Sequence, residues 1–305
     1  MHGNITVNAI HQAITSLSTK SAKVLHDLGQ TLLAFYAYDN FDVDLKLLIH
    51  TAEKSEDTLK HLTSAIVFPF QHGVKQEDMR CSEELWSQSQ LNPRVNISDL
   101  PMGRTWKDLL TLHPEAKHSS GLTQHTRFNS WKFLWDLCHH GPNYLAQFQA
   151  NIGDAEVIEQ IPIVKTPTIP ACAMEFSNST VSRNISIVKN LTEQGGVGDP
   201  NDPETQNEVV DLTPYVILFH SDLGTGDHLL SIQSCHAIEK SAWNQFQFAI
   251  FVPGLFHIKM ACVDMLWCIF IQPPEGRVDD TCLMRDISKL HPKETGIIAS
   301  KPGFH

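Results

Sequence analysis

Carboxylates that follow two strand-like segments are the side chains best suited to chemistry. In α/β sheets ligands gather at the carboxyl ends of strands, where side chains from neighbouring strands share a crevice. Mg²⁺ and Mn²⁺ prefer oxygen ligands, and two such ions can clamp both oxygens of a phosphodiester reaction. The sequence therefore predicts an Mg²⁺ or Mn²⁺ site. Its candidate ligands are Asp39, Asp42, Asp222 and Asp227. The alternative is that each acid begins a turn or caps the next helix.

A second pair of candidates lies in the apolar segment Pro253–Trp267. His257 and Asp264 are seven residues apart, which places them on one helical face two turns from each other. Both can face a common cleft, with His257 as a proton carrier or ligand. The predicted catalytic set consists of Asp39, Asp42, Asp222, His257 and Asp264. The alternative is that His257 and Asp264 are hydrogen-bonded polar residues at the margin of a buried helix.

A zinc site is a third hypothesis, because imidazole, thiolate and carboxylate groups suit that ion. Several such residues cluster in one stretch of the sequence. They are His220, Asp222, Asp227, His228, Cys235 and His236. Their spacing matches no zinc motif, and the seven cysteines of the chain include no CxxC pair.

The elements that must position these residues are strands at both ends of a predicted α/β fold. Residues 28–75 and 209–272 form the two halves of a mixed-sheet core within a single domain, residues 1–305. Residues 76–208 form a mainly helical insertion. The segments Thr31–Val43 and Leu59–Phe70 are predicted to pair as neighbouring strands. Gln194–Glu208 has no apolar periodicity and is predicted to be a flexible loop.

Charge is distributed unevenly along the 305 residues, whose formal net charge is -11. Residues 101–150 hold five basic and three acidic side chains, whereas residues 201–250 hold one basic and seven acidic ones. The acidity argues against a wholly basic nucleic-acid coat and is concentrated around Asp222. The apolar stretch Phe248–Ile271 contains Pro253, Lys259 and Asp264, which favours a buried helix over a membrane span. We expect an intracellular protein without a membrane segment.

Seven segments, in this order, resemble a large family of domains of unknown function that is abundant in mushroom-forming fungi, with more distant animal relatives. The segments are YDNFDVD (Tyr38–Asp44), TLKHLTSAIVFPFQHGV (Thr58–Val74), RFNSWKFLWDLCHHGPNY (Arg127–Tyr144), VIEQIPIVKTPTIPA (Val157–Ala171), QGGVGDP (Gln194–Pro200), HSDLGTGD (His220–Asp227) and FVPGLFHIKMACVDMLW (Phe251–Trp267). Members of that family are transposon-like in their distribution, and their pattern is similar to a ribonuclease-H-like transposase core.

The resemblance implies that Asp39 or Asp42 is the first metal-binding acid and Asp222 the second. Ser221 stands where glycine is common, and Asp227-His228 stands where relatives have a Glu-Arg-like pair. The family continues beyond the position of His305, so we expect the chain to be a partial member. A third carboxylate on a later helix is then an open question.

Two functions follow from the sequence. The first is a metal-dependent nucleic-acid-processing core of the transposase or nuclease type, or its inactive remnant, with nucleic acid as partner and a nuclear location. The Trp106–Trp135 region would supply stacking surfaces and positive charge for a strand. The second is a non-catalytic interaction or structural domain in which the acids are turn and cap residues.

Overall fold

The computed structural model describes residues 7–44, 59–96, 98, 100, 106–109, 118–157, 163–205 and 208–266. They belong to two compact units. The sheet unit contains Met1–Asp99 and Thr166–His305, and the helical unit contains Leu100–Lys165. The helical unit therefore covers only part of residues 76–208, the predicted insertion.

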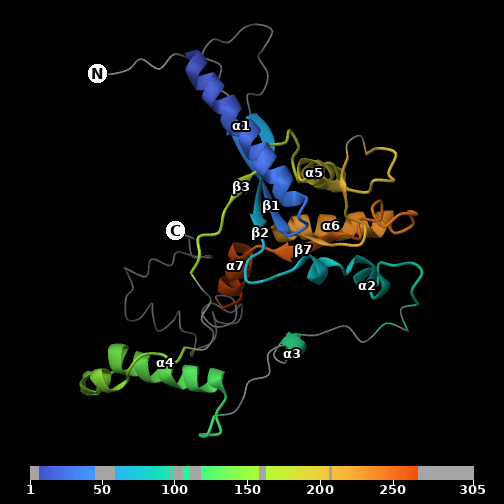
Figure 1. The fold of residues 1–305 in the computed structure, drawn as a ribbon. Coiled ribbons are helices and arrows are strands. Elements are labelled where there is room, and N and C mark those ends of the chain that lie inside the picture. The colour runs from blue at the N-terminus through green and yellow to red at the C-terminus, as the bar shows by residue number, and fades with distance from the viewer. Residues whose placement is uncertain are drawn as a thin grey trace, which may run out of the picture. The chain divides into compact units, whose positions relative to one another are not determined.

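A five-stranded mixed sheet organises the sheet unit (Figure 1). The strands are β1 (Ala34–Asp44), β2 (Leu59–Pro69), β3 (Ile169–Pro170), β6 (Ile217–Ser221) and β7 (Ala249–Pro253). Their order is β3-β2-β1-β6-β7. Strands β1, β6 and β7 are parallel, and β2 runs antiparallel to both of its neighbours. The predicted mixed α/β class and the pairing of the first two long strands are both confirmed.

The burial of side chains alternates along the strands and shows which face of the sheet is covered. In β1, Tyr36 and Tyr38 are buried, whereas Phe35 and Ala37, which alternate with them, are only partly buried. Successive side chains of a strand point to opposite faces, so one face of the sheet carries the core. β6 follows the same rule, and its Phe219 ring packs beside the Tyr36 ring with centroids 5.6 Å apart.

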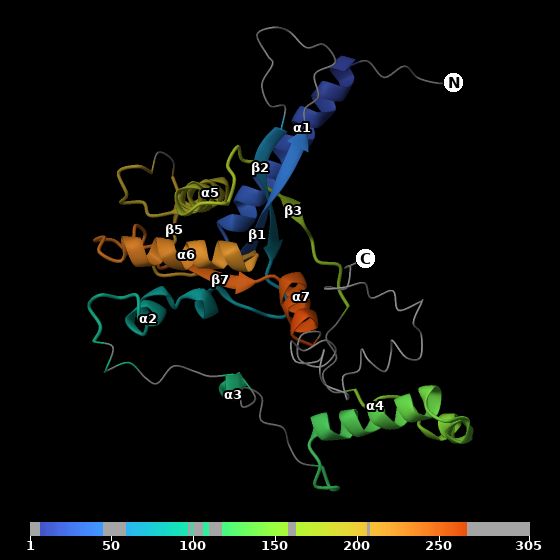
Figure 2. The same ribbon diagram turned by 180° about the vertical axis from the view of Figure 1, so that it is seen from behind.

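Three helices contribute to the core on this face. They are α5 (Val181–Gln194), α6 (Leu223–His236) and the carboxyl end of α1 (Val7–Gly29). Both views show α5 and α6 beside the sheet (Figures 1 and 2). Buried residues recur at three- or four-residue spacing in α5 and α6, as an amphipathic helix requires. They are Asn184, Ile187, Val188, Leu191 and Thr192 in α5, and Thr225, Gly226, Leu229 and Ile232 in α6.

Strand β1 ends one residue beyond its predicted segment, because its ladder with β2 extends to the pair Asp44 and Leu59. One expectation about the other elements is wrong. The segment predicted as a buried helix is β7 followed by α7 (Leu255–Leu266), and α7 contains no buried residue. Although α7 is apolar in composition, the described part of the chain does not bury it.

The glycine-rich segment after α5 also differs from its prediction. Gly195 to Asp199 are buried, and β4 (Val197–Gly198) pairs in parallel with β5 (Val210–Asp211). Gly195 to Asp199 are thus part of the core, although the sequence predicts a flexible loop for them. Its glycines permit backbone contacts that any side chain would prevent.

Tyr36 offers a direct test of the packing in this core. Its side chain is buried, and among the described residues its hydroxyl group has no hydrogen-bond partner. Burial also raises the pKa of Tyr36, so the hydroxyl keeps its proton. Because an unpaired buried hydroxyl is destabilising, we expect Tyr36→Phe to raise the free energy of unfolding by about 1 kcal/mol. Urea denaturation followed by circular dichroism would measure the change, and a loss of stability would contradict it.

The helical unit is built around α4 (Gln124–His140) and the 3-10 helix η3 (Asn143–Asn151), with the short α3 (Trp106–Leu109) preceding them. Thr123 caps α4 by accepting a hydrogen bond from the Thr126 amide. Gln149 Nε2 donates to the Cys138 carbonyl at 2.8 Å, and Trp131 Nε1 donates to the Gly153 carbonyl at 3.2 Å. These bonds hold η3 and the residues after it against α4.

Candidate functional site

Two of the predicted acids lie near the point where the parallel ladder between β1 and β6 ends, with Asp39 in the middle of β1 and Asp222 directly after β6. The register pairs Ala37 with His220, so Asp39 and Asp222 each lie two residues beyond the last paired residue of their strand. The strands stay together at this level, since Ser221 Oγ donates to the Tyr38 carbonyl at 2.8 Å. Adjacent strands lie about 4.8 Å apart. The pairing of β1 with β6 therefore brings the backbone of Asp39 near that of Asp222.

Asp222 stands between β6 and α6 and is the N-cap of that helix. Its Oδ1 accepts a hydrogen bond from the Thr225 amide at 2.7 Å. Its Oδ2 receives no hydrogen bond from the described residues and is free to bind another group. The GTG sequence here is structural, because a Cβ at Gly226 would lie 2.5 Å from the Phe251 ring. Gly226 thus permits α6 to approach β7 closely.

The other predicted metal ligands lie elsewhere. Asp42 is three residues beyond Asp39, about 10 Å along the strand, and its Oδ1 lies 2.7 Å from His61 Nδ1 on β2. That ion pair is exposed to solvent. Asp227 is exposed, one and a half turns into α6. Asp39 is also exposed, and its Oδ1 accepts from the Asn40 amide. The geometry therefore favours Asp39 over Asp42 as the neighbour of Asp222.

His257 and Asp264 are both on α7, which follows β7 at the same end of the sheet. The Gly254 amide donates to the Ser221 carbonyl at 3.0 Å and ties the start of α7 to the end of β6. His257 lies close to Gly254 and is partly buried, whereas Asp264 is exposed two turns further on. The helix thus keeps His257 near the end of β6 and carries Asp264 away from it.

A buried polar network next to Asp222 escaped the sequence analysis. The Tyr38 hydroxyl donates to Asn184 Oδ1 at 3.0 Å, and Asn184 Nδ2 donates to the carbonyls of Asn178 and Thr180. Asn178 Nδ2 in turn donates to Thr225 Oγ1 at 3.0 Å, and Asn40 bonds to Asn178. The network ties β1, α5 and the first turn of α6 together. Sequence offers only one signal for it, a polar Asn at a core position of an amphipathic helix.

The negative charge of Asp222 acts on a member of this network, Tyr38. Burial raises the pKa of Tyr38, and the nearby Asp222 carboxylate raises it further. Tyr38 therefore stays protonated and remains a hydrogen-bond donor to Asn184. On the other face of the sheet, partial burial lowers the pKa of His220, whose ring lies 4.9 Å from the Phe35 ring. His220 is thus disposed to remain neutral.

The donor set suits a hard cation better than zinc. Within the described residues, no group of three or more His, Cys, Asp or Glu side chains could hold a metal ion. Zinc sites use three or four protein ligands, so these residues give the zinc hypothesis no support. Mg²⁺ is commonly held by one or two carboxylates, with waters and substrate phosphates as its other ligands. Asp39 and Asp222 are the two predicted ligands whose backbones the pairing of β1 with β6 brings near each other.

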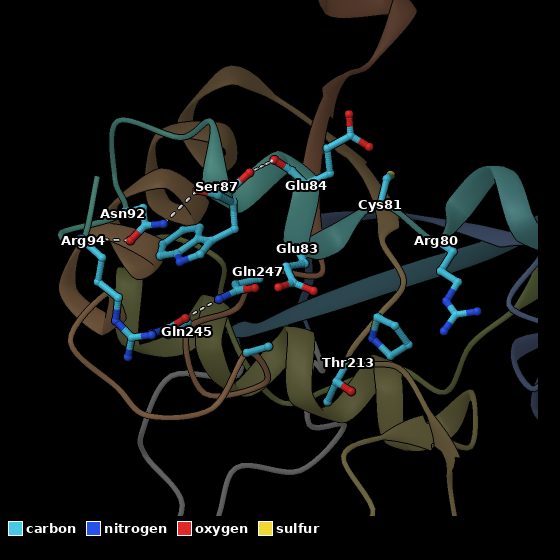
Figure 3. Close-up of a pocket in the computed structure, with 13 residues that line it drawn as sticks. Arg80, Cys81, Glu83, Glu84, Ser87, Asn92, Arg94, Thr213, Gln245 and Gln247 are labelled. Carbon is cyan, nitrogen blue, oxygen red and sulfur yellow. Dashed lines mark hydrogen bonds between the residues drawn. The ribbon is translucent and has the colours of Figure 1, made fainter. Parts of the chain in front are cut away.

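A cavity of about 850 Å³ lies at the opposite end of the parallel strands (Figure 3). Its walls come from α2 (Ser82–Ser87) and the residues around it, from Thr213 and Pro214, which precede β6, and from the loop between α6 and β7. Figure 3 shows Glu83 between Arg80 and Arg94. The whole of β6 separates Thr213 from Asp222, about 16 Å of strand. A ligand in this cavity would not touch the acids, and we place the candidate site at the carboxyl end.

The described helices include none that is both long and apolar enough to cross a membrane.

Comparison with known proteins gives one match. A family model described as a family of unknown function (DUF6589) matches residues 103–305, two thirds of the chain. This region includes Asp222 and α7 but begins after Asp39 and Asp42. No curated protein and no solved structure matches the chain. By the extent of the model match, the chain belongs to the DUF6589 family of unknown function.

Proposed function

We propose that the sheet unit is a ribonuclease-H-like core that cleaves or transfers phosphodiester bonds of nucleic acid with Mg²⁺ or Mn²⁺, as a transposon-derived enzyme would. The observation that carries this proposal is that Asp39 and Asp222 each follow, by two residues, the last paired residues of the adjacent parallel strands β1 and β6. The strand order β3-β2-β1-β6-β7, with only β2 antiparallel, supports it, because ribonuclease-H-like sheets have this arrangement. The resemblance to domains with a transposon-like distribution also supports the proposal.

Each residue has a distinct part in this proposal. The Thr225 amide fixes Oδ1 of Asp222, which leaves Oδ2 to bind the cation, and Asp39 supplies the second carboxylate from β1. A bound divalent ion would polarise the phosphodiester and activate a water molecule. The network through Asn178 and Thr225 holds the Asp222 turn in place before substrate arrives. Preorganised ligands of this kind lower the cost of binding.

The helical unit offers a surface for a nucleic-acid strand. Its helix α4 carries an aromatic row in which the Trp135 ring stacks on His139 at 4.0 Å, with Trp131 one turn before it. Lys132 Nζ lies 4.7 Å from the centre of the Trp135 ring. Aromatic rings with adjacent cations bind single strands by stacking and charge, largely without regard to sequence. A nuclear location would follow from this function.

The second candidate is a non-catalytic interaction domain, and one observation favours it. Capping α6 is by itself a sufficient structural reason for Asp222 to be present. Under this hypothesis Asp39 and Asp222 bind no metal, and the sheet unit serves only as a scaffold. The substitution Asp222→Asn separates the two functions, since asparagine caps helices as well as aspartate but lacks the charge that a cation requires.

We expect Asp222→Asn and Asp39→Asn each to weaken Mn²⁺ binding by at least about tenfold, because each removes one of two charged ligands. Asp42→Asn is the matched control and should leave the affinity within about twofold, since Asp42 is paired with His61. Isothermal titration calorimetry with Mn²⁺ measures the affinity, and a labelled DNA substrate reports cleavage. Absence of Mn²⁺ binding by the unaltered protein, or equal binding by all variants, would rule out the enzyme and leave the scaffold.

A further inference from the structure

The cavity beside α2 is a site that the proposed metal chemistry does not use. Its volume of about 850 Å³ is that of a pocket for a small molecule, and all of its lining residues belong to the sheet unit. Polar and charged residues make up most of its wall (Figure 3). A ligand there would lie at the other end of β6 from Asp222, so this site is independent of the candidate metal site.

Hydrogen bonds hold the walls of the cavity in place. The Ser82 amide donates to the Pro214 carbonyl at 3.3 Å, which joins α2 to the residues before β6. In the loop between α6 and β7, the buried Gln245 side chain donates through Nε2 to the carbonyls of Ala237 and Glu239. The cavity is thus formed without a ligand, which lowers the cost of binding one.

Arg94 is the cation of the cavity that is best placed to bind an anion. Its amide donates to Oδ1 of the buried Asn92 at 3.0 Å, and Asn92 Nδ2 donates to the Trp86 carbonyl at 3.2 Å. These bonds fix the backbone of Arg94 at the wall. Within the described residues, the guanidinium groups of Arg94 and Arg80 have neither an ion pair nor a hydrogen bond. A guanidinium group can bind a phosphate through two parallel hydrogen bonds.

Gln247 and Trp86 supply contacts that suit a nucleobase. Gln247 Nε2 donates one hydrogen to Gln245 Oε1, and within the described part of the chain its second N–H and its Oε1 have no partner. An amide with a free donor beside a free acceptor can pair with the edge of a base, as glutamine does with adenine. Trp86 also lines the cavity and is only partly buried, which leaves part of its side chain accessible for stacking on a base.

Glu83 and Glu84 narrow the choice of ligand. Both line the cavity, and Figure 3 shows Glu83 between Arg80 and Arg94. Two carboxylates offset the charge of two guanidinium groups, so an anion without donor groups meets both attraction and repulsion. A purine nucleotide carries a phosphate for an arginine and, on adenine or guanine, an exocyclic amino group for a carboxylate. Its ring system also offers a larger area for stacking than a pyrimidine does.

We propose that this cavity binds a purine nucleoside monophosphate. The phosphate pairs with the Arg94 guanidinium, and the base stacks on Trp86. The edge of the base bonds to the Gln247 amide, with its amino group donating to Glu83. The Cys81 thiol at the same wall is no nucleophile, because burial and a nearby carboxylate raise its pKa and keep it protonated. The cavity therefore binds the nucleotide without reacting with it.

Isothermal titration calorimetry of the full chain tests the proposal. AMP and GMP should bind at a single site, and UMP and inorganic phosphate should bind at least about tenfold more weakly. Arg94→Gln should raise the dissociation constant of AMP by at least about tenfold, because it removes the cation that pairs with the phosphate. The matched control Arg183→Gln removes another exposed arginine, on α5 and outside the cavity, and should leave that constant within about twofold.

Gln247→Leu tests recognition of the base. It should weaken AMP binding by at least about tenfold without changing the affinity for inorganic phosphate, whereas Gln88→Leu, at an exposed position outside the cavity, should change neither. Circular dichroism checks folding, and Arg94→Gln remains the test if Gln247→Leu does not fold, since Arg94 is exposed.

Three results would overturn the proposal. The first is no binding of AMP or GMP at millimolar concentration, and the second is equal AMP affinity of Arg94→Gln and Arg183→Gln. The third is AMP binding no tighter than that of inorganic phosphate, which would mean an anion site without a pocket for the base.

Discussion

Gly195→Ala is expected to lower the free energy of unfolding by about 3 kcal/mol, at the upper end of the cost of overpacking a core. A Cβ at this position would lie 2.2 Å from the Tyr36 hydroxyl oxygen. Gly195 has an ordinary backbone conformation, with φ at -77°. Alanine is therefore not strained in itself, and the cost arises from the clash. The Tyr36 ring cannot move aside easily because it is fully buried beside Phe219. Urea denaturation followed by circular dichroism measures the loss.

Combining this change with Tyr36→Phe should recover at least half of the lost stability, because phenylalanine lacks the oxygen that the new methyl group meets. Gly29→Ala is the matched control. Its Cβ would meet the Gly195 backbone and not a side chain, so Tyr36→Phe should add to it only the gain of about 1 kcal/mol that it gives the unaltered protein. If the two glycine variants respond alike to Tyr36→Phe, the proposed clash is not the cause of the instability.

The same glycines show why one part of the sequence prediction failed. A run such as QGGVGDP contains the residues of flexible loops, and glycine also occurs where two backbones must touch. The sequence does not distinguish these causes, because the contacts of Gly195 are with Tyr36 and Gly29, more than 150 residues earlier. The burial of Gly195 to Asp199 depends on that tertiary packing.

Strand prediction succeeded where the signal was local. The β-branched and aromatic runs of β2 and β6 identify these strands without knowledge of their partners. Strand β1 ends within one residue of its predicted segment and begins three residues later. The apolar run of α7 was misassigned to the core because hydrophobicity alone does not show what covers a helix.

The position of Asp222 could be predicted because its sequence signals are local. Asp222 follows a strand and caps a helix, and both features can be recognised in the sequence. The choice between Asp39 and Asp42 could not be made there, because it depends on the register between β1 and β6 and on the partner of Asp42 across β2. The polar network was missed because Tyr38 and Asn184 are 146 residues apart.

Asn184→Leu is expected to have the largest effect on stability, a loss of about 4 kcal/mol, because it leaves several buried polar groups without their partner. Asn184 is fully buried on the core face of α5. Its amide group accepts from Tyr38 and donates to the Asn178 and Thr180 carbonyls, and its Nδ2 lies 3.1 Å from His228 Nδ1. Leucine is similar in size but can make none of these bonds. Urea denaturation would again measure the change.

Asn190→Leu is the matched control, since it makes the same substitution on the same helix at a partly buried position. Among the residues that the structure describes, Asn190 Oδ1 bonds only to Gln194. This variant should cost less than about 1 kcal/mol. Adding Tyr38→Phe to Asn184→Leu removes one of the buried polar groups that have lost their partner. This second change should recover about 1 kcal/mol of stability. Equal losses in Asn184→Leu and Asn190→Leu would mean that the buried bonds contribute nothing beyond helix propensity. A loss confined to Asn184 would establish that the buried hydrogen bonds of this network stabilise the fold.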